Sequence, residues 1–234
     1  MKRIPVLFEN EFCLVLSKPA GLAVQGGKGI KVSLDSILGQ SFAKRPFLVH
    51  RLDRDTSGLI LIAKNHEAAA VFARLFADKN SGLVKQYMAI TRGIPEPAKG
   101  VIIMDMEIQG KLKKTETSYK LLGQTEPDIS FPSFSLLELE LGTGRMHQIR
   151  RHLMQINHPV LGDDKYGDFA LNKELKKTMG LKRLLLHSQR LAVPPIPPML
   201  PEGLDIKDQL PDYFLFFMNR LALIAGPIDN KGVF

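Results

Sequence analysis

The sequence predicts an α+β fold, and three observations support this class. Apolar runs rich in Val, Ile and Leu, bounded by Gly and Pro, follow one another as strands, whereas few segments have helical periodicity. The glycines of GGKGIK have neither the spacing of a dinucleotide-binding fingerprint nor the ending of a P-loop. No repeat and no linker divides the chain, so we expect one domain over residues 1–234.

The predicted strands are short apolar or alternating segments. In Ser135–Leu141, Leu137, Leu139 and Leu141 face one way and the two glutamates between them face the other way. This alternation is typical of an antiparallel strand with one face in solvent. By these criteria the predicted strands are Cys13–Leu16, Leu59–Ala63, Lys85–Ile90, Val101–Met106 and Phe134–Leu141.

Apolar residues at three-to-four spacing predict the helices. Asn65 can cap the first helix, and Asn157-His158-Pro159 ends the second. We expect the third helix to dock against the sheet, since it is apolar on most of its surface. The predicted helices are His66–Asp78, a segment that begins near Gly144, and Asp212–Ile224. Between the last strand and this third helix, Val193–Pro201 has five prolines in nine residues and should run extended over the surface.

Charge, hydropathy and cysteine content restrict the kinds of protein that this chain can be. The chain has a net charge of +8 and a pI near 9.5, and +6 of that charge lies between Arg145 and Arg190, which favours a polyanionic partner. No apolar run approaches the roughly 18–20 residues of a membrane span, which excludes a membrane-embedded protein. The N-terminus does not resemble a signal peptide, and the single cysteine, Cys13, cannot form an internal disulfide. We therefore expect a cytoplasmic protein with Cys13 as a buried apolar filler.

The densest polar cluster is HRLDRDTSG, residues 50–58, directly before the predicted strand Leu59–Ala63. Leu52 can anchor this turn and leave Asp53 between the guanidinium groups of Arg51 and Arg54. Because nearby arginines favour the ionised form of a carboxyl group, Asp53 is expected to act as a base or nucleophile. The alternative is an ordinary turn in which the carboxylates accept backbone hydrogen bonds.

A second cluster, GTGRMHQIRRH, begins the second predicted helix. The helical wheel places Arg150 at the edge of the apolar stripe and Arg151 on the opposite side. A partly buried guanidinium needs a carboxylate partner, for which we choose Asp53. Near the helix N-terminus, backbone amides favour phosphate, and the side chains placed there are Arg145, His147 and Gln148. A solvated basic helix face is the alternative interpretation.

These two clusters carry a family resemblance. HRLDRDTSGLILIAK, residues 50–64, closely resembles the catalytic motif of the RluA-type pseudouridine synthases, and GRMHQIRRHLMQINHPVLGDDKYG, residues 144–167, resembles the downstream motif of that family. Shorter matches lie in the same order at Lys18–Val24, Lys85–Tyr87 and Arg183–Leu191. Met146, Arg151 and Asn157 depart from the residues common in the family, but none of these departures removes a reactive group.

The resemblance implies isomerisation of uridine to pseudouridine in ribosomal or transfer RNA, without metal, nucleotide or organic cofactor. It implies Asp53 as the catalytic aspartate, Tyr87 as the aromatic residue packed on the target base, Arg150 as the basic partner of the aspartate, and Arg51 as the residue that fills the space of the displaced nucleotide. It also implies a long, mixed, mostly antiparallel sheet with flanking helices and a central active-site cleft. The small N-terminal RNA-binding domain of many relatives is expected to be absent, and the protein to be a monomer.

Contacts to RNA are expected from basic and polar side chains around the two motifs. Phosphate contacts offset the cost of extracting the target base from its stack. The expected RNA-binding residues are Arg51, Arg54, Arg145, His147, Gln148, Lys165, Lys176 and Lys177. Two alternatives remain: a non-catalytic RNA-binding or ribosome-assembly protein on the same scaffold, and an aspartate-dependent hydrolase acting on nucleosides.

Overall fold

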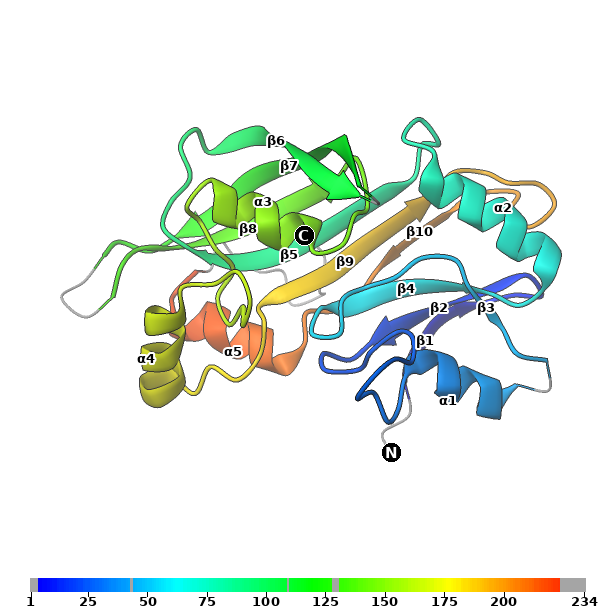
Figure 1. The fold of residues 1–234 in the computed structure, drawn as a ribbon, viewed down its shortest axis with the longest axis horizontal. Helices are drawn as coiled ribbons and strands as arrows, with labels where there is room; N and C mark the ends of the chain where they lie inside the picture. Colours follow the sequence, from blue (N-terminus) through cyan, green and yellow to red (C-terminus); the bar gives the residue numbers. More distant parts are fainter. Residues whose placement is uncertain (1–3, 43, 109, 128–130, 224–234) are drawn as a thin grey trace. The chain divides into compact units, whose positions relative to one another are not determined.

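The computed structural model describes residues 4–42, 44–108, 110–127 and 131–223. In these ranges the chain has ten strands and five helices, and the strands pair mostly antiparallel, as the predicted α+β class requires (Figure 1). The chain divides into two compact units, Met1–Lys85 with Ser188–Asp208, and Gln86–His187 with Gln209–Phe234. That residues 1–234 act as one catalytic domain, with a central cleft, stays a prediction.

The first unit is built on antiparallel strands. β2 pairs with β1 on one side and with β4 on the other, in a register that joins Cys13 to Ala63 and Lys18 to Gly58. β3 also pairs with β4, and β10 pairs with β9. The elements are β1 (Val6–Glu9), β2 (Cys13–Lys18), α1 (Leu34–Ser41), β3 (Phe47–Leu48), β4 (Ser57–Ala63), α2 (His66–Ala77), β9 (Leu186–Val193) and β10 (Leu204–Lys207); the first two residues of β9 belong to the second unit.

Helix α2 covers one face of β4 and closes the core of this unit. As predicted, Asn65 caps the helix, since its side chain accepts a hydrogen bond from the backbone amide of Ala68. Phe72 on α2 packs with Leu59 and Leu61 of β4. Cys13 lies in the same cluster, fully buried, and burial raises the pKa of its thiol to about 11. The predicted role of Cys13 as a small buried residue is confirmed.

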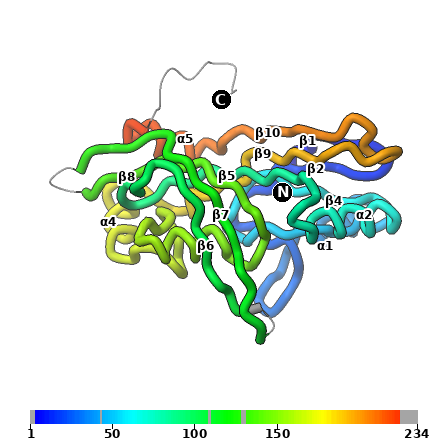
Figure 2. Tube along the Cα trace, turned by 90° about the horizontal axis from the view of Figure 1, so that it is seen from above, coloured from blue at the N-terminus to red at the C-terminus, as the bar shows by residue number. Residues whose placement is uncertain are grey.

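The second unit contains a four-stranded antiparallel arrangement in the order β5-β8-β7-β6. Its strands β6 and β7 run side by side as a long hairpin (Figure 2). Tyr87 of β5 pairs with Leu139 of β8. The elements are β5 (Val84–Arg92), β6 (Lys99–Ile108), β7 (Lys111–Gln124), β8 (Phe134–Leu141), α3 (Gln148–Gln155), α4 (Phe169–Met179) and α5 (Asp212–Arg220); the first two residues of β5 belong to the first unit.

Helices α4 and α5 share a core with β5 and β8. Leu175 of α4 and Phe214 of α5 are fully buried beside Ile90 and Leu136. The predicted docking of the third helix against strands is thus confirmed within this unit. The helix ends at Arg220, and the expected final residue, Ile224, lies outside the described residues.

The proline-rich segment differs from the prediction. Instead of running extended, residues 196–200 close a turn in which Ile196 and Leu200 exchange two backbone hydrogen bonds of 2.7 and 2.8 Å. Met199 and Leu200 are buried in the core of the first unit. The apolar residues between the prolines therefore decide the path, because burying them outweighs the extended preference of the prolines.

Candidate active site

The loop of residues 50–56 is held from behind by a buried lysine. Lys18 is fully buried, and its ammonium group donates to the backbone carbonyl oxygens of Pro19, Leu22 and Arg54 at 3.0, 2.9 and 3.1 Å. The same carbonyl of Arg54 accepts a 2.9 Å hydrogen bond from the amide of Gly21. The residue that follows Asp53 is therefore fastened to the 18–22 turn by two hydrogen bonds.

Burial and nearby charges act on Lys18 in opposite directions. Burial lowers the pKa of Lys18 to about 8, while the negative charges of Asp55 and Asp53 work against this shift. Near neutral pH the side chain thus remains an ammonium ion with three hydrogens for its three acceptors. The lysine supplies a positive charge beneath the loop that carries both carboxylates.

The first residues of the loop are fixed to the interior of the first unit. His50 stacks on Phe76 at a centroid distance of 4.0 Å, and its Nε2 accepts a 2.8 Å hydrogen bond from the amide of Leu61. Burial, with a smaller contribution from Lys85, lowers the pKa of His50 to about 3. Leu52 is buried, as expected of an anchor. His50 is thus a neutral structural residue.

Gly58, the second residue of β4, follows the loop in a backbone conformation with φ of 108°. A Cβ atom at this position would lie 2.2 Å from the carbonyl oxygen of Ser188 in β9. Both the positive φ and the close approach of a neighbouring strand require glycine. This glycine lets the chain pass from the polar loop directly into the buried strand β4.

Asp53 itself is half-buried, whereas Arg51 and Arg54 are exposed. The expected placement of Asp53 between two guanidinium groups differs from the structure in one respect, since Arg54 forms an ion pair of 3.4 Å with Asp55. The ionised, catalytic state of Asp53 stays a prediction.

In the second unit, Gln148 holds the loop before α3. Its Oε1 accepts from Thr143 Oγ1 at 2.6 Å and from the Arg145 amide at 3.1 Å, and its Nε2 donates to the Glu116 carbonyl and to Thr117 Oγ1. Only 2% of Gln148 is exposed. The expectation of an RNA-binding Gln148 therefore differs from the structure, because its amide group is already occupied by β7 and the loop.

His147 marks the true beginning of α3. The helix was expected from near Gly144, but it begins at Gln148, because residues 143–147 form a turn and His147 has a left-handed φ of 54°. A non-glycine residue in this conformation is uncommon and clusters at functional sites. His147 Nδ1 lies 3.1 Å from the hydroxyl of Tyr166, and the two rings pack edge to face.

Arg150 forms a buried bidentate ion pair. Its Nε and Nη2 each lie 2.7 Å from a carboxylate oxygen of Asp163, and Nη2 also contacts Asp164 at 3.1 Å. The side chain of Arg150 is 5% exposed, so the helical wheel correctly predicted burial. The described contacts give Arg150 the carboxylates of Asp163 and Asp164. Pairing with Asp53 stays a prediction, since Asp53 belongs to the first unit and Arg150 to the second.

The carboxylate of Asp163 contacts three residues of the second unit, Arg150, Lys165 and Tyr166. Burial alone would raise its pKa, but hydrogen bonds from Arg150 and from the amides of Tyr166 and Lys165 hold that pKa below the usual value. The Arg150 guanidinium also lies 5.3 Å from the centre of the Tyr166 ring. The ionised carboxylate thus orients Arg150, Lys165 and Tyr166 together.

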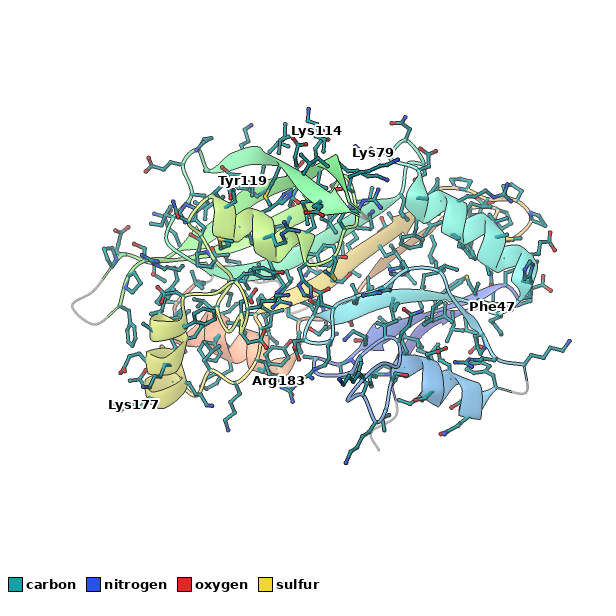
Figure 3. The ribbon with its side chains drawn as sticks, in the orientation of Figure 1. Phe47, Lys79, Lys114, Tyr119, Lys177 and Arg183 are labelled. Carbon is teal, nitrogen blue, oxygen red and sulfur yellow. The ribbon has the colours of Figure 1, made fainter. Side chains whose placement is uncertain are left out.

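The remaining predicted site residues lie as follows. Tyr87 is buried in β5, and its stacking on a base stays a prediction. Arg151 is half-buried on α3, and Arg145 is exposed in the turn before this helix. Lys165, Lys176 and Lys177 are exposed, and Lys177 lies at the C-terminal end of α4 (Figure 3). The structure therefore gathers His147, Arg150 and Lys165 around Asp163 and Tyr166 in the second unit.

Asp163, Tyr166 and Lys18 were not predicted to belong to the site, although all three lie inside the motifs that resemble the family. Asp163 and Tyr166 stand in GDDKYG, and the signal was an acidic pair within a strongly basic stretch. Lys18 stands in the Lys-Pro turn, and the signal was a lysine at the end of an otherwise apolar strand. In the part of the chain that the structure describes, no group of three or more His, Cys, Asp or Glu is arranged to hold a metal ion, and no helix is long and apolar enough to cross a membrane.

Comparison with known proteins identifies the class. Residues 13–155 match the model of the RNA pseudouridylate synthase family. This range includes the Asp53 loop, the hairpin of β6 and β7, and α3 with its preceding turn. The chain belongs to the RNA pseudouridylate synthase family.

Individual relatives are similar over most of the chain. The ribosomal large subunit pseudouridine synthase C of Haemophilus ducreyi is 34% identical over 195 residues, which cover 80% of this chain and 60% of the relative. The tRNA pseudouridine synthase C of the same organism is 33% identical over 206 residues, which cover 80% of this chain and 84% of the relative. The chain thus spans only part of the length of the ribosomal relative.

A solved structure supports the fold. Human RNA pseudouridylate synthase domain containing 4 superposes with a TM-score of 0.75 and 28% sequence identity, covering 94% of this chain and 93% of the human chain. The α+β class with mostly antiparallel strands is therefore shown both by the structure and by this similarity.

Proposed function

We propose that this protein isomerises uridine in RNA to pseudouridine, with Asp53 as the catalytic carboxylate. The observation that carries the proposal is the Asp53 loop, which is fixed by Lys18 and His50 in a chain that belongs to the RNA pseudouridylate synthase family. A loop fixed at this many points holds a carboxylate in one position, as a reacting group requires.

The reaction breaks the bond between the base and the ribose, rotates the base and rejoins it through carbon five. No atoms are gained or lost and no electrons leave the substrate. An ionised Asp53 is required whether it attacks the anomeric carbon, adds to the pyrimidine ring or removes a proton from the ribose. We propose Tyr87 as the stacking residue for the extracted uracil and Arg150 as the basic partner of Asp53.

The proposed substrate is structured RNA, either ribosomal or transfer RNA. Relatives of this chain carry both kinds of name, ribosomal large subunit and tRNA pseudouridine synthase. Exposed basic side chains support contacts to phosphate, namely Arg51, Arg54, Arg145, Lys165, Lys176 and Lys177. We further propose that the protein is a cytoplasmic monomer that acts as one catalytic domain without a cofactor.

The experiment is conversion of ribosomal and transfer RNA by the parent and by Asp53→Asn. The parent should form pseudouridine without changing the mass of the RNA. The variant should bind RNA with similar affinity and form no product, because its amide lacks the ionised oxygen. Release of free uracil would indicate a hydrolase, and equal inactivity of parent and variant on both RNA classes, with RNA binding retained, would indicate a non-catalytic RNA-binding protein.

A further inference from the structure

Helix α4 presents one aromatic ring and three lysines on the same side. At 100° per residue, Lys173, Lys176 and Lys177 fall within about 80° of Phe169 around the helix axis. All four residues are exposed, and Phe169 is 61% exposed. Successive positions four residues apart lie roughly 6 Å apart along the helix. The four side chains therefore form a continuous strip, which we call the α4 strip.

The opposite side of α4 is firmly attached to the second unit. Leu175 is fully buried, and Leu171 and Met179 pack against the same core. Asp168 caps the helix by accepting from the amide of Leu171 at 3.0 Å, and it also pairs with Arg92 at 3.1 Å. The α4 strip is thus displayed on a rigid helix and not on a loop.

The charge of the strip is not neutralised locally. In the described ranges none of Lys173, Lys176 and Lys177 takes part in an ion pair. Residues 169–183 contain five basic side chains and one acidic side chain, Glu174, which gives this segment a charge of +4. An anionic partner is therefore favoured, and several adjacent cations suit a repeating anion.

The attraction of an anion to the lysines does not explain why the ring of Phe169 is exposed. A large exposed aromatic ring at the first turn of a helix contributes nothing to the core, and it lies at the end of a row of lysines. Aromatic rings next to a basic track are the means by which proteins hold unpaired nucleotides, because every base offers a face for stacking. An acidic peptide would use the lysines, but it would give the ring no flat partner.

We propose that the α4 strip binds an unpaired stretch of RNA, with one base stacked on Phe169 and adjacent phosphates held by Lys173, Lys176 and Lys177. This site deepens the proposed function and rests on it for the class of partner. It contributes affinity for single-stranded segments of the substrate and takes no part in the chemistry at uridine. The protein would thus prefer target sites flanked by unpaired nucleotides.

The chain contains no tryptophan, so Phe169→Trp creates a single fluorescent reporter in the strip. The probe is an oligoadenylate, which contains no uridine and cannot be a substrate. We expect its stacking to quench the tryptophan emission. A fully paired duplex of the same length should bind through its phosphates with little quenching, because its bases are not available.

Phe216→Trp is the matched control. Phe216 is 50% exposed on α5 of the same unit, but Asp212 and Arg220 lie four residues before and after it, and α5 itself contains no lysine. Its emission should not respond to oligoadenylate. Equal quenching of both reporters, no quenching of the Phe169→Trp variant, or equal quenching by single strand and duplex would each overturn the proposal. A response of the Phe169→Trp variant to poly-glutamate equal to its response to oligoadenylate would point to an acidic peptide instead.

Two further variants separate the two parts of the strip. Phe169→Ala should weaken oligoadenylate binding about tenfold, which corresponds to 1.4 kcal/mol. Replacing the three lysines with Ala should flatten the dependence of log affinity on log salt by about 0.7 for each phosphate that is no longer bound. Oligoadenylate affinity and its salt dependence are the quantities measured, and variants that keep the parent's values of both would overturn the proposal. Loss of oligoadenylate binding in these two variants, with pseudouridine still formed, supports the α4 strip as a binding site. If Asp53→Asn has no effect on product formation, the proposed function fails and the α4 strip is not affected.

Discussion

Arg150 of α3 and Asp163 are joined by two hydrogen bonds of 2.7 Å, and the side chains of both residues are at least 95% buried. Asp163 also accepts from the amides of Lys165 and Tyr166, both at 2.9 Å. One carboxylate therefore joins α3 to the turn that follows it along the chain. The geometry of the predicted basic partner of Asp53 depends on a residue thirteen positions further on.

Asp163→Asn should strongly destabilise the protein. The substitution removes the charge of the buried bidentate partner of Arg150 and leaves its contact with the exposed Asp164, at an expected cost of about 3–5 kcal/mol. Asp205→Asn is the matched control, because Asp205 also accepts two hydrogen bonds from one arginine, Arg190, but at an exposed site. The control should cost less than about 1 kcal/mol. Urea unfolding at pH 7.5 measures both, and similar costs would contradict the argument.

Arg150 and Arg151 should differ in their effects on activity. If Arg150 is the partner of Asp53, Arg150→Ala removes a cation that favours the ionised carboxylate and shifts the acid limb of the activity profile to higher pH. Arg151→Ala should change only RNA affinity. Asp163→Asn serves as the comparison for structural damage, because it disturbs the same pair and leaves Arg150 charged. An acid limb that moves in Asp163→Asn but not in Arg150→Ala would refute the pairing.

Lys18 should act as a positioning residue. Lys18→Met removes the donor to three carbonyl oxygens behind the Asp53 loop, so turnover should fall about 100-fold while RNA affinity is retained. Lys64→Met is the control, since Lys64 contacts Glu9 and the Asn10 carbonyl at the other end of β4. Equal turnover in the two variants would show that the loop does not need its lysine.

The pH dependence of stability gives a second test of Lys18. Its pKa is about 8 in the folded protein and about 10.4 in an unfolded chain. Between these values the unfolded state binds more protons, so the unfolding free energy contributed by this group rises with pH by about 1.4 kcal/mol per unit. Urea unfolding from pH 7.5 to 10.5 should show this rise in the parent and not in Lys18→Met.

Gly58→Ala should be far more harmful than Gly180→Ala. Both glycines have positive φ, 108° and 75°, but an added Cβ meets the Ser188 carbonyl only at Gly58, whereas nothing lies within 4 Å at Gly180. The left-handed conformation alone costs about 1 kcal/mol, and the clash must add to it. Thermal unfolding of the two variants, compared with the parent, measures the difference. Equal losses of stability in the two variants would mean that β9 can move away from the added Cβ atom.

Buried histidines should make the fold sensitive to mild acid. Burial, together with the charge of Arg151, lowers the pKa of His152 to about 4, and burial lowers that of His187 to about 4 as well. Because an unfolded histidine titrates near 6.5, stability is fully present above pH 6.5 and falls as the pH drops toward 4, by about 1.4 kcal/mol per unit for each group. His152→Asn should reduce this slope, and His66→Asn, at an exposed position, should not.

The sequence predicted the buried elements better than the exposed ones. The five predicted strands and three helices all exist, because their apolar residues repeat with a clear period. Strand β7 was missed since its first residues, Lys111–Lys114, are exposed on both faces and hide the alternation. Helix α4 was missed because its apolar side is narrow: only Leu171, Leu175 and Met179, four residues apart, face the core, and Phe169 lies on the opposite side.

For the candidate site, residue types were easier to predict than contacts. The wheel placed Arg150 at the edge of the apolar stripe, and the structure buries it almost completely. The wheel could not find Asp163, because a partner across a turn leaves no periodic signal. The sequence placed Gln148 near phosphate by its position at a helix start. Whether a side chain at such a position faces solvent or a neighbouring strand depends on tertiary packing. Here the amide group of Gln148 donates its hydrogen bonds to β7.

The turn that Gln148 fastens also exposes a methionine, Met146, which is 63% accessible. The single cysteine offers no competing target, because Cys13 is fully buried and its thiol is protonated at physiological pH. Among the methionines that the structure describes, Met146 is the most exposed, so peroxide would oxidise its thioether most readily, to a polar sulfoxide that methionine sulfoxide reductases can reverse. Beside Arg145, this oxidation would make the turn a reversible point of damage on the proposed RNA-binding surface.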